Sequence, residues 1–177
     1  MGFFSPFVAL SLNSSTPSRF KSDVSVVNID KIQLYIDMGR LKISTDGSPI
    51  TMRELLRSGV VSSVKEGGVK LLGGGSSSGA VKDAINVEVA RASKSAIEAI
   101  ESVGGSVTCV YHNRVALRAH LKPECFPTVM PKHARPPPQL MPYYLDYENR
   151  GYLSPQLQLR KQLEKLHLKE EDLVVEK

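Results

Sequence analysis

The stretch that most constrains the fold of this chain runs from residue 67 to residue 107, where short apolar segments and a capped helix alternate with glycines. The first apolar segment, 69–72, ends at the three glycines 73–75, where continuing a regular element would cost much backbone entropy. Apolar and polar residues then alternate over 85–90, the period of a strand with one face on a core. We therefore predict two strands separated by a loop rich in glycine and serine.

A helix is predicted after the second strand. Ser95 and Glu98 have the spacing of a capping box, and Ser93 is a second candidate for the N-cap. Five apolar residues at spacings of three and four share one face of this helix, namely Ala96, Ile97, Ala99, Ile100 and Val103. Two glycines follow and offer the left-handed conformation that often ends a helix, and residues 107–111 then read as a third strand.

The order of these segments resembles a known family. Residues 70–75 (KLLGGG), a variable loop, the alternating strand and residues 92–105 (ASKSAIEAIESVGG) are similar to the C-terminal domain of the large-ribosomal-subunit protein fifteen family. Residues 111–124 and 142–153 resemble the extension found in the mitochondrial branch of that family. The resemblance implies an irregular superhelix of strand–strand–helix turns. It rests on the order of segments over residues 24–153 and not on one short motif.

The resemblance also implies a function. It predicts a structural constituent of the mitochondrial large ribosomal subunit in the matrix, with ribosomal RNA and neighbouring ribosomal proteins as partners and without a cofactor or a small-molecule substrate. The family carries a basic arm rich in Gly, Arg and Lys before the matching domain, and only Gly2-Phe3-Phe4 resembles the end of that arm. We therefore expect this chain to lack the RNA contacts that the arm makes.

Segment 1–23 is rich in serine and has few basic residues, so we expect an extended segment and neither a transit peptide nor a secretory signal. The formal net charge is +5 and the isoelectric point is near 9.2, which favours acidic partners such as nucleic acid. Two cysteines are too few for a disulfide framework, so a reducing compartment is predicted. No apolar run approaches the ~20 residues that span a bilayer, and with 6% aromatic residues and no Trp a base-stacking platform is not suggested.

Local patterns elsewhere indicate a single layered α/β domain over residues 24–122. A strand at 24–29 is predicted to enter a helix that ends near Met38. Thr51 and Glu54 form another capping box, which predicts a short helix over 52–58.

The region after Tyr111 permits two interpretations. Apolar residues alternate over 113–121 as in a strand, whereas Asn113 as cap and Pro123 as terminator frame a two-turn helix, which we favour. Residues 123–153 are predicted to be an extended Pro-rich extension, with a polyproline segment at 136–138 and no compact core before Pro142. Ser154 and Pro155 are expected to open a C-terminal helix or tail over 154–177. Its apolar seam consists of Leu159, Leu163 and Leu166.

Three kinds of functional site are disfavoured by spacing. The glycine run 73–79 lacks the Gly-Lys-Ser/Thr of a phosphate loop, so we interpret it as a flexible connection. Two cysteines and two histidines superficially resemble a zinc site, but the strand pattern makes Cys109 a small core residue, so no metal is predicted. No nucleophile has a nearby general base, so no catalytic residue is predicted and the chain is not expected to be an enzyme.

Basic residues are the remaining signal. Between residues 112 and 135 they outnumber the single acid Glu124, and such clustering is typical of phosphate contacts. Together with the resemblance, this predicts ribosomal RNA contacts at Arg114, Arg118, Lys122, Lys132 and Arg135, and, near the glycine loop and helix start, at Lys70, Arg91 and Lys94. The competing hypothesis is a non-ribosomal protein-interaction module that uses the Pro-rich segment and the C-terminal helix.

Overall fold

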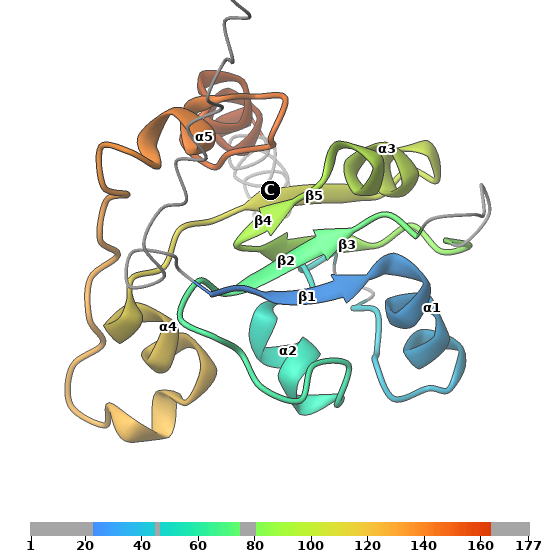
Figure 1. Cartoon of the computed structure of the whole chain (residues 1–177), viewed down its shortest axis with the longest axis horizontal. Helices are drawn as coiled ribbons and strands as arrows, with labels where there is room; N and C mark the ends of the chain where they lie inside the picture. The colour runs from blue at the N-terminus through green and yellow to red at the C-terminus, as the bar shows by residue number, and fades with distance from the viewer. Residues whose placement is uncertain (1–22, 45–46, 75–80, 164–177) are drawn as a thin grey trace, which may run out of the picture.

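The structure is a computed structural model that describes residues 23–44, 47–74 and 81–163. Small parallel sheets form its centre, with α1 (Ile29–Asp37) and α2 (Met52–Arg57) on one side of the strands and α3 (Lys94–Ser102) on the other (Figure 1). One continuous apolar core lies between these layers, and its largest fully buried side chains include Ile32, Leu55 and Ile100. The predicted α/β class is confirmed.

Two sheets divide the strands between them. In the first, β1 (Ser25–Asn28), β2 (Val69–Leu72) and β4 (Arg91–Ala92) are parallel in the order β1-β2-β4. In the second, β3 (Asn86–Val89) pairs in parallel with β5 (Ser106–Cys109). Parallel neighbours require crossovers, and the helices supply the crossover from β1 to β2 and from β3 to β5.

The predicted strand 85–90 is interrupted where the chain changes sheets. Val89 and Ala90 are both buried although they are consecutive, so the alternation of a single strand breaks there. The backbone N–H of Ala90 already donates to the carbonyl of Val69, 3.1 Å away in the other sheet. The two-residue strand β4 follows immediately and has no signal of its own in the sequence pattern.

Most helix boundaries agree with the local signals. The backbone N–H of Thr51 donates to Glu54 Oε2 over 2.7 Å, as the capping box before α2 predicts. Gly39, Gly59 and Gly104 have φ angles of +69°, +85° and +88°, so each supplies the left-handed residue that follows its helix.

The predicted capping box of α3 is wrong. Ser93 is the N-cap, and its Oγ accepts the N–H of Ala96 over 3.3 Å. The same Oγ also accepts the N–H of Gly73, 3.2 Å away at the end of β2, so a tertiary contact selects Ser93. Ser95 is an exposed residue of the first turn, and a Cβ on Gly73 would lie 2.7 Å from its Oγ.

The region after Tyr111 is helical. Helix α4 (Arg114–Leu121) begins at Asn113, whose side chain accepts the N–H of Ala116 over 2.8 Å. It ends just before Lys122 and Pro123, where the short 3-10 helix η2 (Pro123–Cys125) follows. The helical interpretation of 113–121 is therefore confirmed, because a side-chain cap and a proline outweigh the alternating pattern.

Residues 140–153 return to the core, which the sequence analysis missed. Helix α5 (Met141–Leu145) buries Tyr144, whose Oη donates to the carbonyl of Ala90 over 3.0 Å. Gly151 bridges to Cys109 beyond the end of α5, so the chain adds an edge to β5. The rings of Tyr111, Tyr143 and Tyr152 pack edge-on against Tyr144 with centroids 5.2–5.9 Å apart. We call these residues the tyrosine corner.

The last described segment, residues 155–163, is helical and begins at Pro155 as predicted. Leu159 and Leu163 are 58% and 57% exposed, whereas Leu166 lies outside the described residues. Within the described ranges, no helix is both long enough and apolar enough to cross a bilayer.

Candidate nucleic-acid interface

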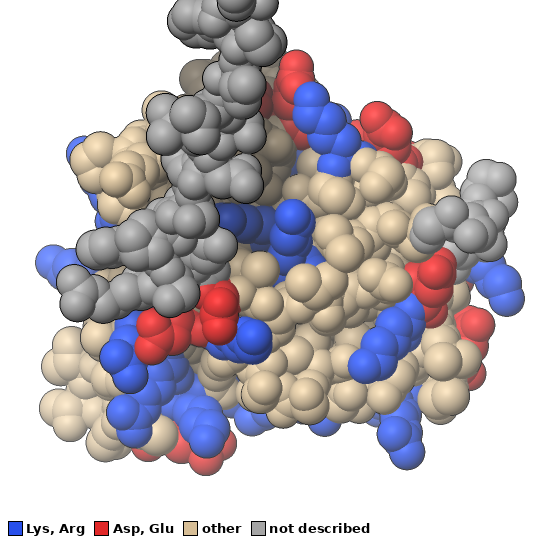
Figure 2. Space-filling view, in the orientation of Figure 1, with Lys and Arg blue, Asp and Glu red and all other residues tan. Residues whose placement is uncertain are grey.

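Helix α4 presents a row of positive charges. Arg114, Arg118 and Lys122 lie four residues apart and are exposed, because the helix buries its opposite face of Ala116 and Leu117 against the domain. Lys and Arg side chains gather over the corner that α4 occupies, with acidic side chains among them (Figure 2). A row of this kind can follow the phosphates of a nucleic-acid strand.

Acidic residues neutralise part of this corner. The Arg114 guanidinium lies 3.3 Å from the Glu66 carboxylate, and Arg57 of the neighbouring helix α2 lies 4.0 Å from Glu124. All four side chains are more than half exposed, so these ion pairs are weak and a phosphate can replace the carboxylate. Arg57 was not predicted as a site residue, because only the fold places α2 beside α4.

The extended segment after η2 passes close to α4. The ring of His133 lies 4.7 Å from that of His112, which precedes α4, and His112 lies 5.1 Å from His120. This contact brings the segment that contains Lys132 and His133 close to the residue that lies two positions before α4. Arg135 lies further along, where its charge partly offsets the raised pKa of Tyr152 in the tyrosine corner.

His112 and His120 contribute little positive charge at neutral pH. The pKa of His112 is lowered to about 4, mainly by burial and also by the neighbouring histidines His120 and His133. Burial also lowers the pKa of His120. These two histidines therefore add little to the positive field that Arg and Lys create at this corner.

Lys70 and Arg91 are partners across β2 and β4, so their side chains lie side by side on one sheet face. Arg91 and Arg114 line the same cavity of about 330 Å³, together with Asn113 at the start of α4. The structure thus connects the second predicted group to the basic row, although 22 intervening residues separate Arg91 from Arg114. Arg91 also lies 6.0 Å from the ring centroid of Tyr143, which restrains its guanidinium.

Lys94 forms a shorter ion pair than Arg114 does. Its Nζ lies 2.6 Å from Glu148 Oε2, and this carboxylate raises the pKa of Lys94. The contact joins the start of α3 to the loop after α5. Because both side chains are more than half exposed, this pair is weak, like that of Arg114 with Glu66, and a phosphate can replace the carboxylate.

The two cysteines differ in their exposure to solvent. Cys109 is fully buried, as the strand pattern predicts, with its Sγ 3.9 Å from Tyr143 Oη, whereas Cys125 is exposed. Burial raises the pKa of the Cys109 thiol to about 11, so it is protonated at neutral pH. Among the residues that the structure describes, no three His, Cys, Asp or Glu side chains are grouped to hold a metal ion. The rest of the glycine run, 75–79, lies outside the described residues.

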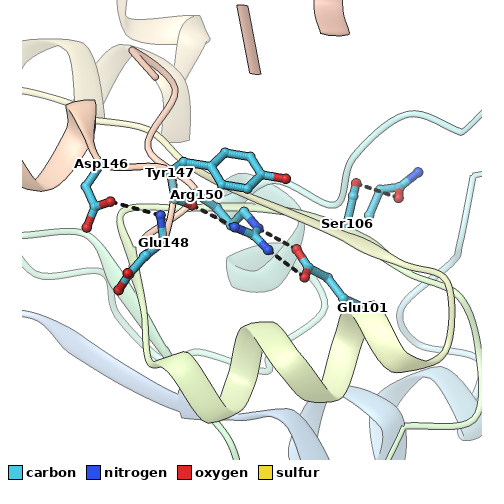
Figure 3. A network of polar contacts seen from close by, with 7 residues as sticks. Glu101, Ser106, Asp146, Tyr147, Glu148 and Arg150 are labelled. Carbon is cyan, nitrogen blue, oxygen red and sulfur yellow. Dashed lines mark hydrogen bonds and ion pairs between the residues drawn. The ribbon is translucent and has the colours of Figure 1, made fainter. Parts of the chain in front are cut away.

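A second polar cluster escaped sequence reasoning. Arg150 donates from Nε and Nη2 to both carboxylate oxygens of Glu101, and the Nη2 bond measures 2.8 Å. Its guanidinium carbon lies 4.2 Å from the ring centroid of Tyr147, and Figure 3 shows that ring beside the ion pair. The backbone of Arg150 is left-handed, with φ of 51°, and no local pattern in the sequence signals this conformation.

Comparison with known proteins defines the class. A family model described as ribosomal proteins 50S-L15 and 50S-L18e, together with their counterpart of the 60S subunit, matches residues 26–108, which span β1 to β5. The chain belongs to this family of large-subunit ribosomal proteins.

Particular relatives refine this placement. The chain is 32% identical to the large ribosomal subunit protein uL15m of Neurospora crassa over 164 residues, covering 79% of this chain and 51% of that protein. It is 38% identical to uL15m of Schizosaccharomyces pombe over 132 residues, covering 72% and 48%. It is 47% identical to the bacterial uL15 of Methylobacterium nodulans over 87 residues, covering 49% of each. The chain thus spans about half the length of the curated relatives it matches.

Proposed function

We propose that this chain is a structural constituent of the large subunit of the mitochondrial ribosome and supports translation by holding ribosomal RNA in place. The two fungal relatives of the mitochondrial type support this proposal, since their similarity extends beyond the domain shared with bacterial uL15. The family consists of ribosomal proteins, whose role is structural and not normally enzymatic. The proposed place of action is the mitochondrial matrix.

The exposed basic row on α4 carries the RNA-binding part of the proposal. Each cation that reaches a phosphate displaces condensed counterions, so a row of three can add strongly to affinity without reading base sequence. Lys132 extends the row from the side, and Arg91 with Lys70 extends it across the cavity of about 330 Å³. We propose these residues as phosphate contacts, with Arg135 and Lys94 as peripheral ones.

The Pro-rich extension and the C-terminal helix are proposed to contact neighbouring ribosomal proteins. The proposed division of the chain is into segments 1–23, 24–122, 123–153 and 154–177. The tyrosine corner joins segment 123–153 to segment 24–122. Leu159 and Leu163 support a protein contact, because two exposed leucines one turn apart form an apolar stripe.

Co-sedimentation tests the proposal. Epitope-tagged chain is expressed in fungal mitochondria, and the lysate is separated on a sucrose gradient at low salt and at high salt. We expect the chain to migrate with large subunits at low salt and to be released by high salt or by RNase. Recovery only in light fractions that are insensitive to RNase would support the interaction-module hypothesis and contradict the ribosomal one.

A further inference from the structure

The polar cluster around Arg150 borders a groove on the side of the domain that carries β3 and β5. The groove has a volume of about 520 Å³, within the range of about 300–1,000 Å³ that small-ligand sites occupy. Its floor is the outward face of the second sheet, formed by Asn86, Glu88, Ser106 and Thr108. Tyr147 and Arg150 form one wall, and the helix at 155–163 forms another.

Tyr147 is a preassembled flat surface in this wall. Its ring is held by the guanidinium of Arg150, which in turn is fixed by two bonds to Glu101 and by a 2.7 Å bond from Nη1 to the carbonyl of Tyr147. The Tyr147 residue is nevertheless 42% exposed, so part of its ring remains open to a partner. An open ring that is already immobilised loses little entropy when another ring stacks on it.

The charges in the groove favour an anion. Arg150, Arg160 and Lys161 outnumber the acids Glu88 and Glu101 by three to two. The pKa of Glu101 is lowered, chiefly by its hydrogen bonds from Arg150, so the negative charge of this carboxylate is paired with the Arg150 guanidinium. The charge of Arg160 also acts on Glu101, and Arg160 and Lys161 lie together on the helix at 155–163, which forms the other wall of the groove.

The floor adds hydrogen-bonding groups. Ser106 Oγ of β5 donates to Asn86 Oδ1 of β3 over 2.8 Å, and Thr108 lies two residues after Ser106 in β5. Asn86 Nδ2 already donates to the carbonyl of Gly47, and the hydroxyl oxygens of Ser106 and Thr108 can accept hydrogen bonds from the hydroxyls of a sugar or the edge of a base.

We propose that this groove binds one unpaired nucleotide of RNA, with the base stacked on Tyr147 and the phosphate facing Arg160 and Lys161. The proposal rests on the proposed ribosomal function and adds a site separate from the α4 row. It assigns a ligand contact to residues 147–161, which lie outside the segment matched by the family model. It also revises the expectation from composition, because one well-placed tyrosine is sufficient for stacking.

Binding of a single-stranded RNA probe tests the site. The purified full-length chain is titrated with a mixed-sequence oligoribonucleotide of about ten nucleotides, and with an abasic oligonucleotide of equal length and charge. The variants are Tyr147→Ala, Tyr147→Phe and, as the matched control, Leu145→Ala, a neighbouring exposed residue outside the groove lining. All variants are first compared with wild type by circular dichroism and thermal unfolding.

Stacking on Tyr147 predicts a specific pattern. Tyr147→Ala should weaken binding of the normal probe by about 5- to 100-fold, whereas Tyr147→Phe and Leu145→Ala should stay within about twofold of wild type. The abasic probe should bind all four proteins alike. Equal affinity of wild type and Tyr147→Ala for the normal probe, or an equal loss with the abasic probe, would overturn the proposal.

Ultraviolet crosslinking in ribosomes separates this inference from the proposed function. If the chain incorporates into large subunits and the RNA crosslink maps to Tyr147, both hold. If it incorporates but the crosslinks fall elsewhere, or Tyr147 crosslinks to a protein, the groove assignment is wrong and the ribosomal function stands. Failure of the wild-type chain to incorporate contradicts the ribosomal function itself, whereas the purified-chain titration still decides whether the groove binds RNA.

Discussion

Neutralising the basic row on α4 is the most direct test of the proposed interface. In the double variant Arg114→Gln with Arg118→Gln, two phosphate contacts are lost and the side-chain length is nearly kept. Each contact contributes about 0.7–0.9 to the slope of log K against log salt concentration. Relative to wild type, loss of two contacts should therefore lower the affinity for RNA about 25- to 60-fold at about 0.1 M salt.

The double variant should fold normally. Arg114 is in the first turn of α4 and Arg118 is in the last, so their interactions with the helix dipole have opposite signs and largely cancel. The exposed pair between Arg114 and Glu66 contributes at most about 1 kcal/mol. Gln and Arg also have similar helix propensities. The free energy of unfolding should change by less than about 1 kcal/mol.

The measurement is the salt dependence of binding of the purified chain to large-subunit RNA. The matched control is Arg40→Gln with Lys42→Gln, which removes the same charge from exposed residues after α1, away from α4 in Figure 1. We expect the slope to fall by about 1.4–1.8 for the α4 variant and by much less for the control. Equal losses in the two variants would refute the assignment of the row, because they would show that only net charge matters.

Three further predictions concern stability, each measured by urea unfolding. Because the pKa of His112 falls from 6.5 to about 4 on folding, the unfolded chain binds more protons in this window. Stability should therefore fall as the pH falls, by about 2 kcal/mol at pH 5 relative to pH 7, and His112→Phe should remove most of this dependence. Tyr144→Phe should cost about 1–2 kcal/mol by leaving the buried carbonyl of Ala90 unpaired, and Tyr144→Ala about 3–5 kcal/mol; no loss in either would contradict the anchoring role. Ser93→Ala should cost about 1 kcal/mol and Ser95→Ala should be nearly neutral; the reverse order would restore the predicted capping box.

Local chemistry was sufficient to predict most of the elements. The glycines after α1, α2 and α3 take left-handed conformations, and caps such as Asn113 mark helix starts, because these preferences act over three or four residues. Where local signals competed, tertiary contacts decided. Ser93 rather than Ser95 caps α3, since only Ser93 also accepts the N–H of Gly73 at the end of β2. Such a contact across 20 residues has no signature in the local pattern.

The packing of the tyrosine corner into the core could not be predicted from the Pro-rich composition of this region. Helix α5 is only five residues long, and its main stabilising features are the burial of Tyr144 and the bond from its Oη to Ala90, 54 residues away. Periodicity cannot reveal so short a helix, because one turn and a half contains too few repeats. The region was therefore predicted as an extension, although its second half packs into the core.

The candidate interface illustrates why charge along a sequence differs from charge on a surface. The cluster predicted over 112–135 contains three histidines, yet burial keeps His112 and His120 largely neutral, and Arg135 lies towards the tyrosine corner. Conversely, Arg91 is distant in sequence but shares a cavity with Arg114. A phosphate in that cavity would be positioned by both the sheet and α4, so replacing either arginine should weaken RNA binding more than replacing an isolated exposed lysine. The fold thus brings two groups of basic residues that are separate in the sequence onto one surface. We expect the affinity of that surface for RNA to depend on how rigidly β4 and α4 are held together.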